Sequence, residues 1–373
     1  MGSLQELGSR PAAWLSGEGE RADIVLSSRV RLARNVAHHL YPPRADTERH
    51  QQVVDLISAA MEKTGVTASG NFFPSSEIDE FSREILIERH LISLEFLRDD
   101  RPRGLFIADD ETASLMVNEE DHLRIQAVSS GMNVHQAMAL ASDIDERLSS
   151  VLEYDTDPRL GYLTACPTNV GTGMRASVLI HLPGLVLTKD MDNVLSQVAK
   201  IGLTVRGFYG EGSDVLGNLF QVSNQTTLGR SEDDLIESLE KVTRQLIAYE
   251  QDARNRLFAD APHQIKDKIW RALGILALAR VLTSDEVMNL LSAVRLGVTA
   301  GIVKGISFAD VNELLLSSQR AHLQRLMRRR MSAEERDIAR AKLVRQRLWP
   351  AIRVMDDIEN DTSKTGETAT DEE

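Results

Sequence analysis

Two short stretches of the chain bring together side chains that can act on a phosphorylated ligand. In the first, three consecutive carboxylates at 119–121 stand shortly before Arg124, and in the second Cys166 precedes a proline, a Gly-Thr-Gly turn and Arg175. Guanidinium groups bind phosphate, carboxylates accept protons, and a glycine-rich turn lets the backbone approach a ligand closely. The sequence therefore predicts a site for a phosphorylated substrate.

Arginines recur beside glycine, serine or acidic residues in well-separated segments. The chain has neither the Gly-x-x-x-x-Gly-Lys-Ser/Thr loop of P-loop enzymes nor the motif set of protein kinases. Several planar guanidinium forks neutralise a triphosphate, and the charge that develops during its transfer, without relying on one lysine. Each arginine alone is more often a surface ion-pair partner, so the prediction depends on the set. Its members are Arg29, Arg31, Arg124, Arg175 and Arg206.

The acidic run at 119–121 has two interpretations. On its spacing alone, it is an exposed acidic turn between two strands. Alternatively, two carboxylates grip the parallel N–H groups of a guanidinium substrate, and one accepts a proton so that the nitrogen can attack a γ-phosphoryl group. Glu120 and Glu211 are the predicted pair.

Cys166 is the only cysteine, which excludes an internal disulfide and fits a reducing cytosol. A lone cysteine is usually an inert, small hydrophobic residue. No histidine stands in an evident nucleophile arrangement with it, so a covalent function is not expected. Because Pro167 and Arg175 are close in sequence, we expect Cys166 to give a cationic substrate positional or electrostatic support.

Composition excludes several classes of protein. No apolar run approaches the roughly 18 residues of a membrane span, and the N-terminus lacks a secretory pattern, so a cytoplasmic protein without membrane contact is expected. The net charge of −13 and the scattered aromatic residues do not form the basic, ring-bearing surface of a nucleic-acid-binding protein.

The elements that must position these residues fall into two parts. In the first, alternating apolar residues and amphipathic helices predict a sheet, with an antiparallel meander over 105–128. From Ser231 onward the pattern is helical, with capping boxes at Ser231, Thr283 and Ser332. The other predicted strands are 23–34, 162–165, 176–182, 204–208 and 219–222. The predicted helices of the first part are 47–63, 76–92, 134–152 and 191–201, and the helical part begins with a helix at 231–260.

These patterns predict the α+β class, with an antiparallel sheet flanked by helices and followed by an all-helical C-terminal domain. The acidic residues near the C-terminus predict a disordered tail. The expected divisions are a lead-in at 1–22, a catalytic domain at 23–255, a helical domain at 256–354 and the acidic tail at 355–373.

Taken together and in order, the motifs closely resemble those of the phosphagen (guanidino) kinase family. They are Ser-Ser-Arg-Val-Arg at 27–31, Val-Asn-Glu-Glu-Asp-His-Leu-Arg-Ile at 117–125, Cys-Pro-Thr-Asn-Val-Gly-Thr-Gly-Met-Arg-Ala-Ser-Val at 166–178 and Val-Ser-Asn-Gln-x-x-Leu-Gly at 222–229. The resemblance implies a glutamine-synthetase-like antiparallel sheet flanked by helices. It also implies that arginines bind ATP together with Mg²⁺. No residue of the chain is predicted to coordinate the metal ion.

Carried over by position, the resemblance implies three catalytic residues, Glu120, Glu211 and Cys166. It also implies a nucleotide site that includes His90 on the adenine side. The implied ATP-binding residues are Ser27, Ser28, Arg29, Val30, Arg31, His90, Arg124, Arg175, Ala176, Ser177, Val178, Leu179, Arg206, Gly207, Phe208, Tyr209, Gly210 and Glu211.

Three departures from the family pattern put free arginine in doubt as the substrate. First, the first motif begins by Ser27, so the usual helical lid is expected to be missing. Second, Phe-Tyr-Gly replaces a Gly-Thr-rich stretch at 208–210. Third, Ile107 stands where a histidine is usual. The expected loss of the N-terminal lid, together with an added helical C-terminal domain, resembles the arrangement in one branch of the family. That branch phosphorylates arginine side chains of proteins in the bacterial Clp stress response. Its implied partners are a stress-gene repressor and misfolded proteins with exposed arginines, the Clp protease system, an activator protein and a second copy of the chain.

The C-terminal domain carries one further motif, in which Arg336 and Arg340 lie one helical turn apart on one face. On spacing alone this is an ordinary solvated basic face. The resemblance implies a phosphoarginine pocket formed by Arg336, Asp337, Arg340 and Ala341. The predicted function is ATP-dependent phosphorylation of protein arginines, including the chain's own. A small-guanidine phosphagen kinase and a non-catalytic phosphoarginine reader are the alternatives.

Overall fold

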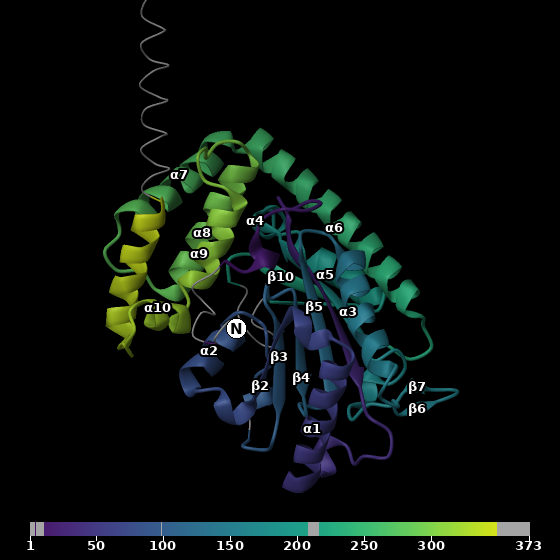
Figure 1. The fold of residues 1–373 in the computed structure, drawn as a ribbon. Helices are drawn as coiled ribbons and strands as arrows, with labels where there is room; N and C mark the ends of the chain where they lie inside the picture. The colour runs from purple at the N-terminus through teal and green to yellow at the C-terminus, as the bar shows by residue number, and fades with distance from the viewer. Residues whose placement is uncertain (1–3, 5–10, 98, 208–215, 349–373) are drawn as a thin grey trace, which may run out of the picture. The chain divides into compact units, whose positions relative to one another are not determined.

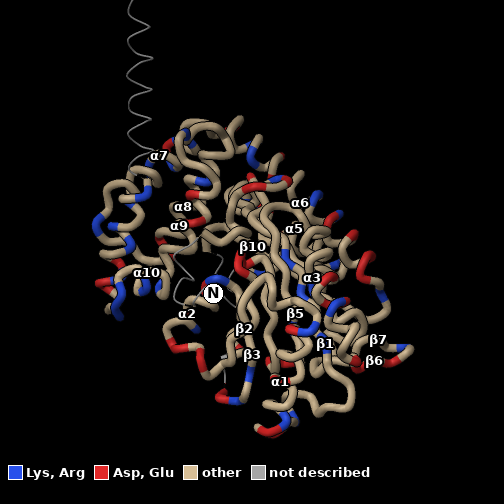
Figure 2. Tube along the Cα trace, in the orientation of Figure 1, with Lys and Arg blue, Asp and Glu red and all other residues tan. Residues whose placement is uncertain are grey.

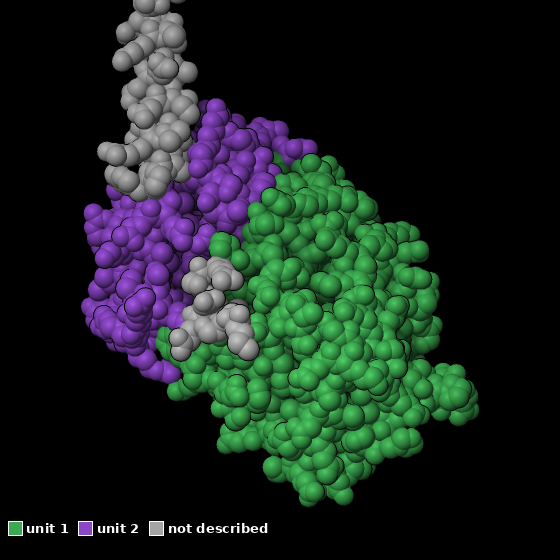
Figure 3. All heavy atoms as spheres, in the orientation of Figure 1, with its two compact units in different colours: residues 1–254 green, residues 255–373 purple. Residues whose placement is uncertain are grey.

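The computed structural model describes residues 4, 11–97, 99–207 and 216–348 of the chain. The chain divides into two compact units, Met1–Arg254 and Asn255–Glu373, which Figure 3 shows in different colours. Helix α6 (Glu232–Asp260) begins in the first unit and ends in the second. Acidic and basic residues both occur along this helix, with acidic residues gathered in its first turns (Figure 2), as is usual for a helix with one solvated side.

Unit 1 is built on an antiparallel eight-stranded sheet with the strand order β2-β3-β4-β5-β1-β8-β10-β9 (Figure 1). The longest strand, β1, lies in the middle of this order and pairs with β5 on one side and β8 on the other. The strands are β1 (Val25–Arg34), β2 (Gly70–Pro74), β3 (Gly104–Ala108), β4 (Ala113–Val117), β5 (Leu123–Ser130), β8 (Met174–His181), β9 (Leu203–Gly207) and β10 (Leu219–Asn224), and a separate ribbon pairs β6 (Thr156–Asp157) with β7 (Gly161–Tyr162).

One face of this sheet is apolar and packs against helices α1 (Thr47–Lys63), α3 (Val134–Ser149), α5 (Met191–Lys200) and α6. Along β1, Val30 and Leu32 point to this face because side chains alternate along a strand. The same apolar cluster includes Ile125 and Val178 from the neighbouring strands and Ile57, Ile144, Val194 and Leu239 from the helices.

The opposite face is divided between apolar and polar parts. Helix α2 (Glu80–Glu88) and the residues after it cover β3 and β4, where Leu105 and Met116 pack with Leu86 and Phe96. On β5, β1 and β8, the same face carries arginine, glutamine and serine side chains. This polar part is where the predicted nucleotide-binding arginines lie.

Arg34, the last residue of β1, connects several elements of unit 1. It is 1% exposed and forms a bidentate ion pair with Asp145 of α3, at 2.7 Å from Nη2 and 3.0 Å from Nε to Oδ2. Its Nη1 donates to the carbonyl of Thr172 at 2.9 Å, and its guanidinium lies 3.5 Å from the centroid of the Tyr162 ring. A buried guanidinium whose donors are all occupied fixes the elements around it.

Every regular element among the described residues of unit 2 is a helix. The hydroxyl of Thr283 caps α8 by accepting from the backbone N–H of Glu286 at 3.2 Å, and Ser307 and Asp310 form a reciprocal capping box at α9. The helices are α4 (Pro183–Leu187) in unit 1, and α7 (Pro262–Leu278), α8 (Ser284–Thr299), α9 (Phe308–Ser317), α10 (Arg320–Leu326) and a last helix at 333–348 in unit 2. Nowhere in the described part is a helix both long and apolar enough to cross a membrane.

The predicted fold class is confirmed, with differences in individual elements. The predicted strand at 162–165 is limited to Gly161–Tyr162, because the following residues turn to hold Cys166. The predicted helix at 76–92 is α2, which begins after its N-cap Asp79 and ends before His90. Strand β2 was not predicted, since its glycine and proline are unusual in a strand. The predicted tail lies outside the described residues.

Candidate active site

Four arginines from three neighbouring strands share the polar face of the sheet. Arg29 and Arg31 alternate with core residues along β1, and Arg175 of β8 is the register partner of Arg31. On the other side of β1, Arg124 of β5 pairs with Ala33, which brings Arg124 to the same face. The sheet thus gathers arginines that are far apart in the sequence, as their predicted common function requires.

These arginines repel one another. Burial and the charges of Arg124 and Arg175 lower the pKa of Arg29 from 12.5 to about 10. Burial, Arg29, Arg124 and Arg175 hold the pKa of Arg31 well below its ordinary value, and Glu119 acts in the other direction. The Nε of Arg31 is buried and has no hydrogen-bond partner among the described residues. Crowded, buried cations form a site for an anion with many oxygens, which would neutralise their charge.

A recess beside Arg29 has the lining expected for a flat heterocycle. Trp14 and His90 meet edge to face, with ring centroids 6.1 Å apart. Burial, Arg29 and Arg31 lower the pKa of His90 to about 3, so its imidazole is neutral at physiological pH. Apolar walls and hydrogen-bonding groups next to an anion site suit the base and phosphates of a nucleotide. Leu91, Gln126, Val128, Leu179 and Gln221 complete this part of the lining.

His90 is held through its backbone. It adopts a left-handed conformation with φ of 58°, and Gln126 donates from Nε2 to its carbonyl at 2.8 Å. The preceding Arg89 forms a buried, bidentate ion pair with Glu111, with distances of 2.6 and 2.7 Å. An unfavourable backbone conformation persists only where the surroundings fix it. The position of the imidazole in the recess is therefore determined by these neighbours.

Glu120 is the partly exposed carboxylate in the turn between β4 and β5, whereas Glu119 and Asp121 on either side are buried. Burial and the charge of Asp121 raise the pKa of Glu120, and the opposing effects come from Arg124 and from a hydrogen bond with Cys166. A carboxylate with a raised pKa and access to solvent is suited to accept a proton from a substrate.

Asp121 connects this turn to the segment that carries Cys166. Its Oδ1 accepts from the backbone N–H of Ala165 and from Nδ2 of Asn35, both at 2.6 Å. The Oδ1 of Asn35 accepts from the backbone N–H of His122 at 2.9 Å. These buried hydrogen bonds place Glu120 and Cys166 on adjoining segments, and the Sγ of Cys166 lies 3.0 Å from the hydroxyl of Thr168.

The glycine-rich turn after Cys166 packs closely against the segment that follows β10. The φ of Gly171 is 116°, and a Cβ at this residue would lie 2.4 Å from the carbonyl oxygen of Thr227. The hydroxyl of Thr227 donates to the carbonyls of Val170 at 2.7 Å and Thr168 at 2.9 Å. Only glycine fits this conformation and this close approach.

Several predicted nucleotide-binding residues have side chains on the other face of the sheet. Val30, Ala176 and Val178 belong to the apolar cluster, and the hydroxyl of Ser28 donates to the carbonyl of Gly131 at 2.9 Å. Any contact of these four residues with a nucleotide would involve their backbone. Ser27, Ser177 and Leu179 lie on the polar face with the arginines and line the recess.

The predicted residues around β9 are described only in part. Arg206 is the register partner of Gln221, which puts it on the polar face, and β9 ends at Gly207. Phe208, Tyr209, Gly210 and Glu211 lie outside the described residues. The pairing of Glu120 with Glu211 therefore stays a prediction.

In unit 2, three of the predicted phosphoarginine residues lie close together on the helix at 333–348. Arg340 is 3% exposed and donates to Asp337 Oδ1 at 2.5 Å and to the carbonyls of Ser318 and Leu282, each at 2.8 Å. Arg336, one turn earlier, is half-buried and donates to a backbone carbonyl at 2.9 Å, and Ala341 is fully buried.

Comparison with known proteins assigns both units. A family model described as ATP:guanido phosphotransferase, C-terminal catalytic domain, matches residues 52–253, and one described as the protein-arginine kinase McsB C-terminal domain matches residues 262–362. The protein-arginine kinases of Desulforamulus reducens and Symbiobacterium thermophilum are each 45% identical to the chain and match 93% and 92% of it and 98% of their own lengths. The chain belongs to the protein-arginine kinase family.

Solved structures of two other kinases share the fold of this chain. Lombricine kinase is 27% identical over 65% of this chain and 70% of its own, with a TM-score of 0.56. The duplicated taurocyamine kinase from Schistosoma mansoni has the same fold, with a TM-score of 0.58, over 77% of this chain and 40% of its own at 24% identity. The predicted family is thus confirmed.

Sequence reasoning missed several residues of the candidate site of this protein-arginine kinase. Trp14 stands alone in a segment without periodicity, and only its size suggested that it would be buried. Asn35 directly follows the strand that carries two predicted arginines, but its contact with Asp121 joins positions 86 residues apart. Contacts of this kind depend on strand order, which local patterns do not provide.

Replacing Arg31 with methionine is expected to separate stability from nucleotide binding. Removing one of the crowded charges should stabilise the protein by about 1 kcal/mol, or roughly 2–4 °C in Tm for a protein of this size. ATP affinity should fall at least about tenfold, because one phosphate-binding fork is lost. Thermal unfolding and calorimetric titration with ATP measure both effects. The exposed Arg49→Met is the control and should change neither, and a lower Tm for Arg31→Met would contradict the argument.

The raised pKa of Glu120 predicts the acid limb of the pH–rate profile. The carboxylate accepts protons only when ionised, so kcat/KM should fall as pH decreases through a pKa above the ordinary value for glutamate, about 4.3. Glu120→Gln should lower kcat/KM across the whole range and remove this limb from the residual activity. An acid limb that persists in Glu120→Gln would show that another group is titrating.

Proposed function

We propose that this chain transfers the γ-phosphoryl group of ATP to arginine side chains of proteins and of itself, producing N-phosphoarginine. One observation carries the proposal: four arginines converge on the sheet face, and the ion pair of Arg124 with Glu119, next to Glu120, joins this face to the turn that carries a proton acceptor. Relatives named protein-arginine kinase, matched over 98% of their length, support a protein arginine as the acceptor.

The proposed transfer uses the groups of unit 1 in a defined order. The carboxylate of Glu120 takes a proton from the target guanidinium, and the freed nitrogen lone pair attacks the γ-phosphorus. A nitrogen–phosphorus bond forms while the bond from the γ-phosphorus to the β–γ bridging oxygen breaks, and ADP leaves with the electron pair. Arg29, Arg31, Arg124 and Arg175 stabilise the negative charge on the transferring group and on ADP.

The remaining predicted catalytic residues support the target side chain in this proposal. Glu211 grips the guanidinium opposite Glu120, and Cys166, whose segment Asp121 ties to the turn of Glu120, supports the same end of the substrate. The neutral His90 contacts the adenine side of the nucleotide, where a charged imidazole would add to the repulsion from Arg29 and Arg31.

Mg²⁺ is the ion that we propose to accompany ATP. This ion is usually held by phosphate oxygens and water with one or two carboxylates, rather than by a cage of protein ligands. Among the described residues, no group of three or more His, Cys, Asp or Glu side chains could hold a metal. The donor set therefore fits an ion that arrives with the nucleotide and neutralises phosphate charge during transfer.

We assign phosphoarginine recognition to unit 2. In this assignment Arg336 and Arg340 provide guanidinium donors for the phosphoryl group and Asp337, which Arg340 holds in place, pairs with the guanidinium. Ala341, the residue after Arg340, is fully buried. The match of residues 262–362 to the McsB C-terminal domain model supports a specialised function for this unit.

In the cell, we propose that the protein acts in the cytoplasm during stress. Phosphorylation replaces the cationic character of an arginine with a bulky anion, which would release an arginine-dependent repressor from DNA and would mark misfolded proteins for the Clp protease system. An activator protein and a second copy of the chain, forming a homodimer, are the other proposed partners.

Incubation of the pure chain with Mg-ATP and an unstructured, arginine-rich protein tests the transfer directly. Phosphoarginine-directed mass spectrometry should find acid-labile phosphate on arginine, and Glu120→Ala should lower the rate by at least about 100-fold because the proton acceptor is lost. Glu62→Ala, an exposed glutamate on α1, is the control and should retain full activity. Phosphoarginine formed by Glu120→Ala at the wild-type rate would contradict the assignment of the base.

The same assay separates the two alternatives. Efficient phosphorylation of free arginine, with no modified protein, would identify a small-guanidine phosphagen kinase. No consumption of ATP with any arginine-containing protein would identify a non-catalytic reader of phosphoarginine.

Binding of free phosphoarginine to the full chain tests the assignment of unit 2. In a Glu120→Ala background, which prevents self-modification, Asp337→Ala and Arg336→Ala should each weaken binding at least about tenfold, since each removes a charge-assisted contact. Arg329→Ala is the matched control, because Arg329 is exposed and pairs with Glu335 near the start of the same helix. Equal affinities for the three variants in calorimetric titration would overturn the assignment.

A further inference from the structure

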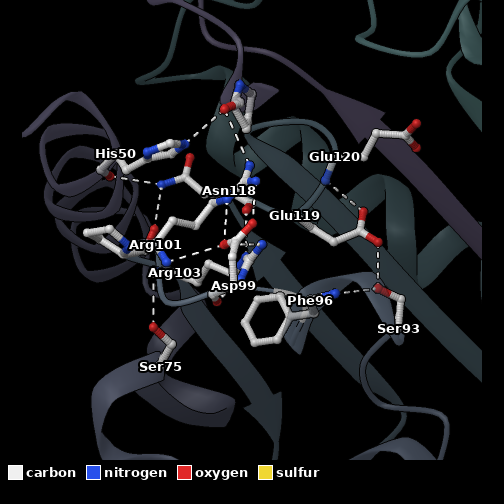
Figure 4. A network of polar contacts seen from close by, with 12 residues as sticks. His50, Ser75, Ser93, Phe96, Asp99, Arg101, Arg103, Asn118, Glu119 and Glu120 are labelled. Atoms are coloured by element: carbon white, nitrogen blue, oxygen red, sulfur yellow. Dashed lines mark hydrogen bonds and ion pairs between the residues drawn. The ribbon is translucent and has the colours of Figure 1, made fainter. Parts of the chain in front are cut away.

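The turn that carries Glu120 is held by the hydrogen bonds of Asn118, two residues earlier, which involve both its side chain and its backbone carbonyl (Figure 4). Asn118 is fully buried, has a left-handed φ of 59°, and donates its backbone N–H to the carbonyl of His122 at 3.1 Å. Its Nδ2 donates to the carbonyls of His50 at 2.8 Å and Pro102 at 3.1 Å. A strained residue with this many fixed contacts sets the direction of the chain that follows it.

Arg103 completes the contacts around Asn118. It is 3% exposed, its Nε donates to the carbonyl of Asn118 at 3.0 Å, and its Nη1 donates to the carbonyl of Asp99 at 2.7 Å. The carboxylate of Asp99 lies 3.0 Å from Nη2, and the guanidinium lies over the ring of Phe96, 5.7 Å from its centroid. Unlike the arginines of the polar face, Arg103 directs its donors at the protein's own backbone.

Ser93 holds the same turn through Glu119. Its hydroxyl donates to Oε1 of Glu119 at 2.5 Å and accepts from the backbone N–H of Phe96 at 3.1 Å. The same Oε1 accepts from Nη1 of Arg124 at 2.5 Å, and Oε2 accepts from the backbone N–H of Glu120 at 2.9 Å. Since Glu119 is 5% exposed, no solvent is at hand to replace a lost partner.

From this geometry we propose that Arg103 and Ser93 are positioning residues that fix Glu120 for proton transfer. Phe96 connects them, with its backbone N–H bonded to Ser93 and its ring under Arg103. Figure 4 shows the carboxylate of Glu120 directed away from this network, so the network restrains the backbone and leaves the carboxylate available to a substrate. The inference rests on the proposed function of Glu120.

Replacing Arg103 with lysine tests the proposal, because lysine keeps the charge and loses the planar fork. We expect kcat for protein-arginine phosphorylation to fall about 10- to 100-fold, the effect of a displacement of about 1 Å at a catalytic group. The KM for ATP should stay within about twofold, because the arginines of the polar face keep their positions.

Arg83→Lys is the matched control for Arg103→Lys. Arg83 also donates to backbone carbonyls, at 3.0 Å to Ile78 and 3.4 Å to Ser75, and neither of these acceptors belongs to the turn of Glu120. Its kcat should equal that of the wild type. Equal losses in the two variants, or a loss in Arg103→Lys that appears only in the KM for ATP, would overturn the proposal.

Ser93 gives a second test that does not depend on a buried charge. Ser93→Ala should lower kcat about tenfold, and Ser93→Thr, which restores a hydroxyl, should recover most of it. Ser69→Ala removes a hydroxyl that donates only to the carbonyl of Val66, and it should have no effect. Wild-type kcat in Ser93→Ala would overturn the proposed function of Ser93.

Alkylation of Cys166 by iodoacetamide reports on Glu120 without any phosphoryl transfer. Cys166 is the only thiol and is partly exposed, and its segment is tied to the turn of Glu120 through the hydrogen bond from the backbone N–H of Ala165 to Asp121. Alkylation should be faster in Arg103→Lys than in the wild type and unchanged in Arg83→Lys. Unchanged alkylation in Arg103→Lys would overturn the proposal, whereas a wild-type protein that phosphorylates no arginine would overturn the proposed function instead.

Discussion

Repulsion among guanidinium groups on one face of the sheet is the constraint on which the rest of unit 1 depends. Arg29 and Arg31 are adjacent on one strand face, with Arg124 and Arg175 on the strands beside them, and burial strengthens every interaction among them. Such a group stays together only on a rigid support. The long, central β1, paired on both sides and packed over its whole opposite face, provides that support and keeps the anion site formed before a nucleotide arrives.

The rigidity of this support comes from contacts that join distant parts of the chain. Arg34 at the end of β1 is fixed to Asp145 of α3 and to the glycine-rich turn through the carbonyl of Thr172, so the strand of the arginines and the turn after Cys166 share one anchor. Asp121 and Asn35 form a similar link between the acidic turn and the segment before Cys166. Fully satisfied buried polar networks of this kind restrict the structure to one arrangement.

Local sequence patterns predicted helices and strands well where apolar residues recur at a regular spacing or where a helix begins at a recognisable N-capping residue. Helix α1 begins and ends at the predicted residues, because Asp46 caps it and its apolar positions recur at helical spacing. The composition of the polar face was harder to predict. The period of a strand shows which of its residues share a face but does not show which strands are neighbours in the sheet. For the same reason local residue patterns, apart from the family motifs, did not distinguish Arg103, which binds backbone, from the arginines that face the nucleotide site. Its surroundings decide its function.

Glu119 explains why the next carboxylate, rather than this one, is suited to accept a proton. Its two oxygens already accept from Ser93, Arg124 and the backbone N–H of Glu120, and protonation would disrupt contacts that hold both a phosphate-binding arginine and the base. Glu120 has a raised pKa and a partly exposed side chain, so it can change protonation state without such a cost. One buried carboxylate thereby ties the anion site to the proton acceptor, and a substrate nitrogen and a γ-phosphoryl group meet in a geometry that the folded chain defines in advance.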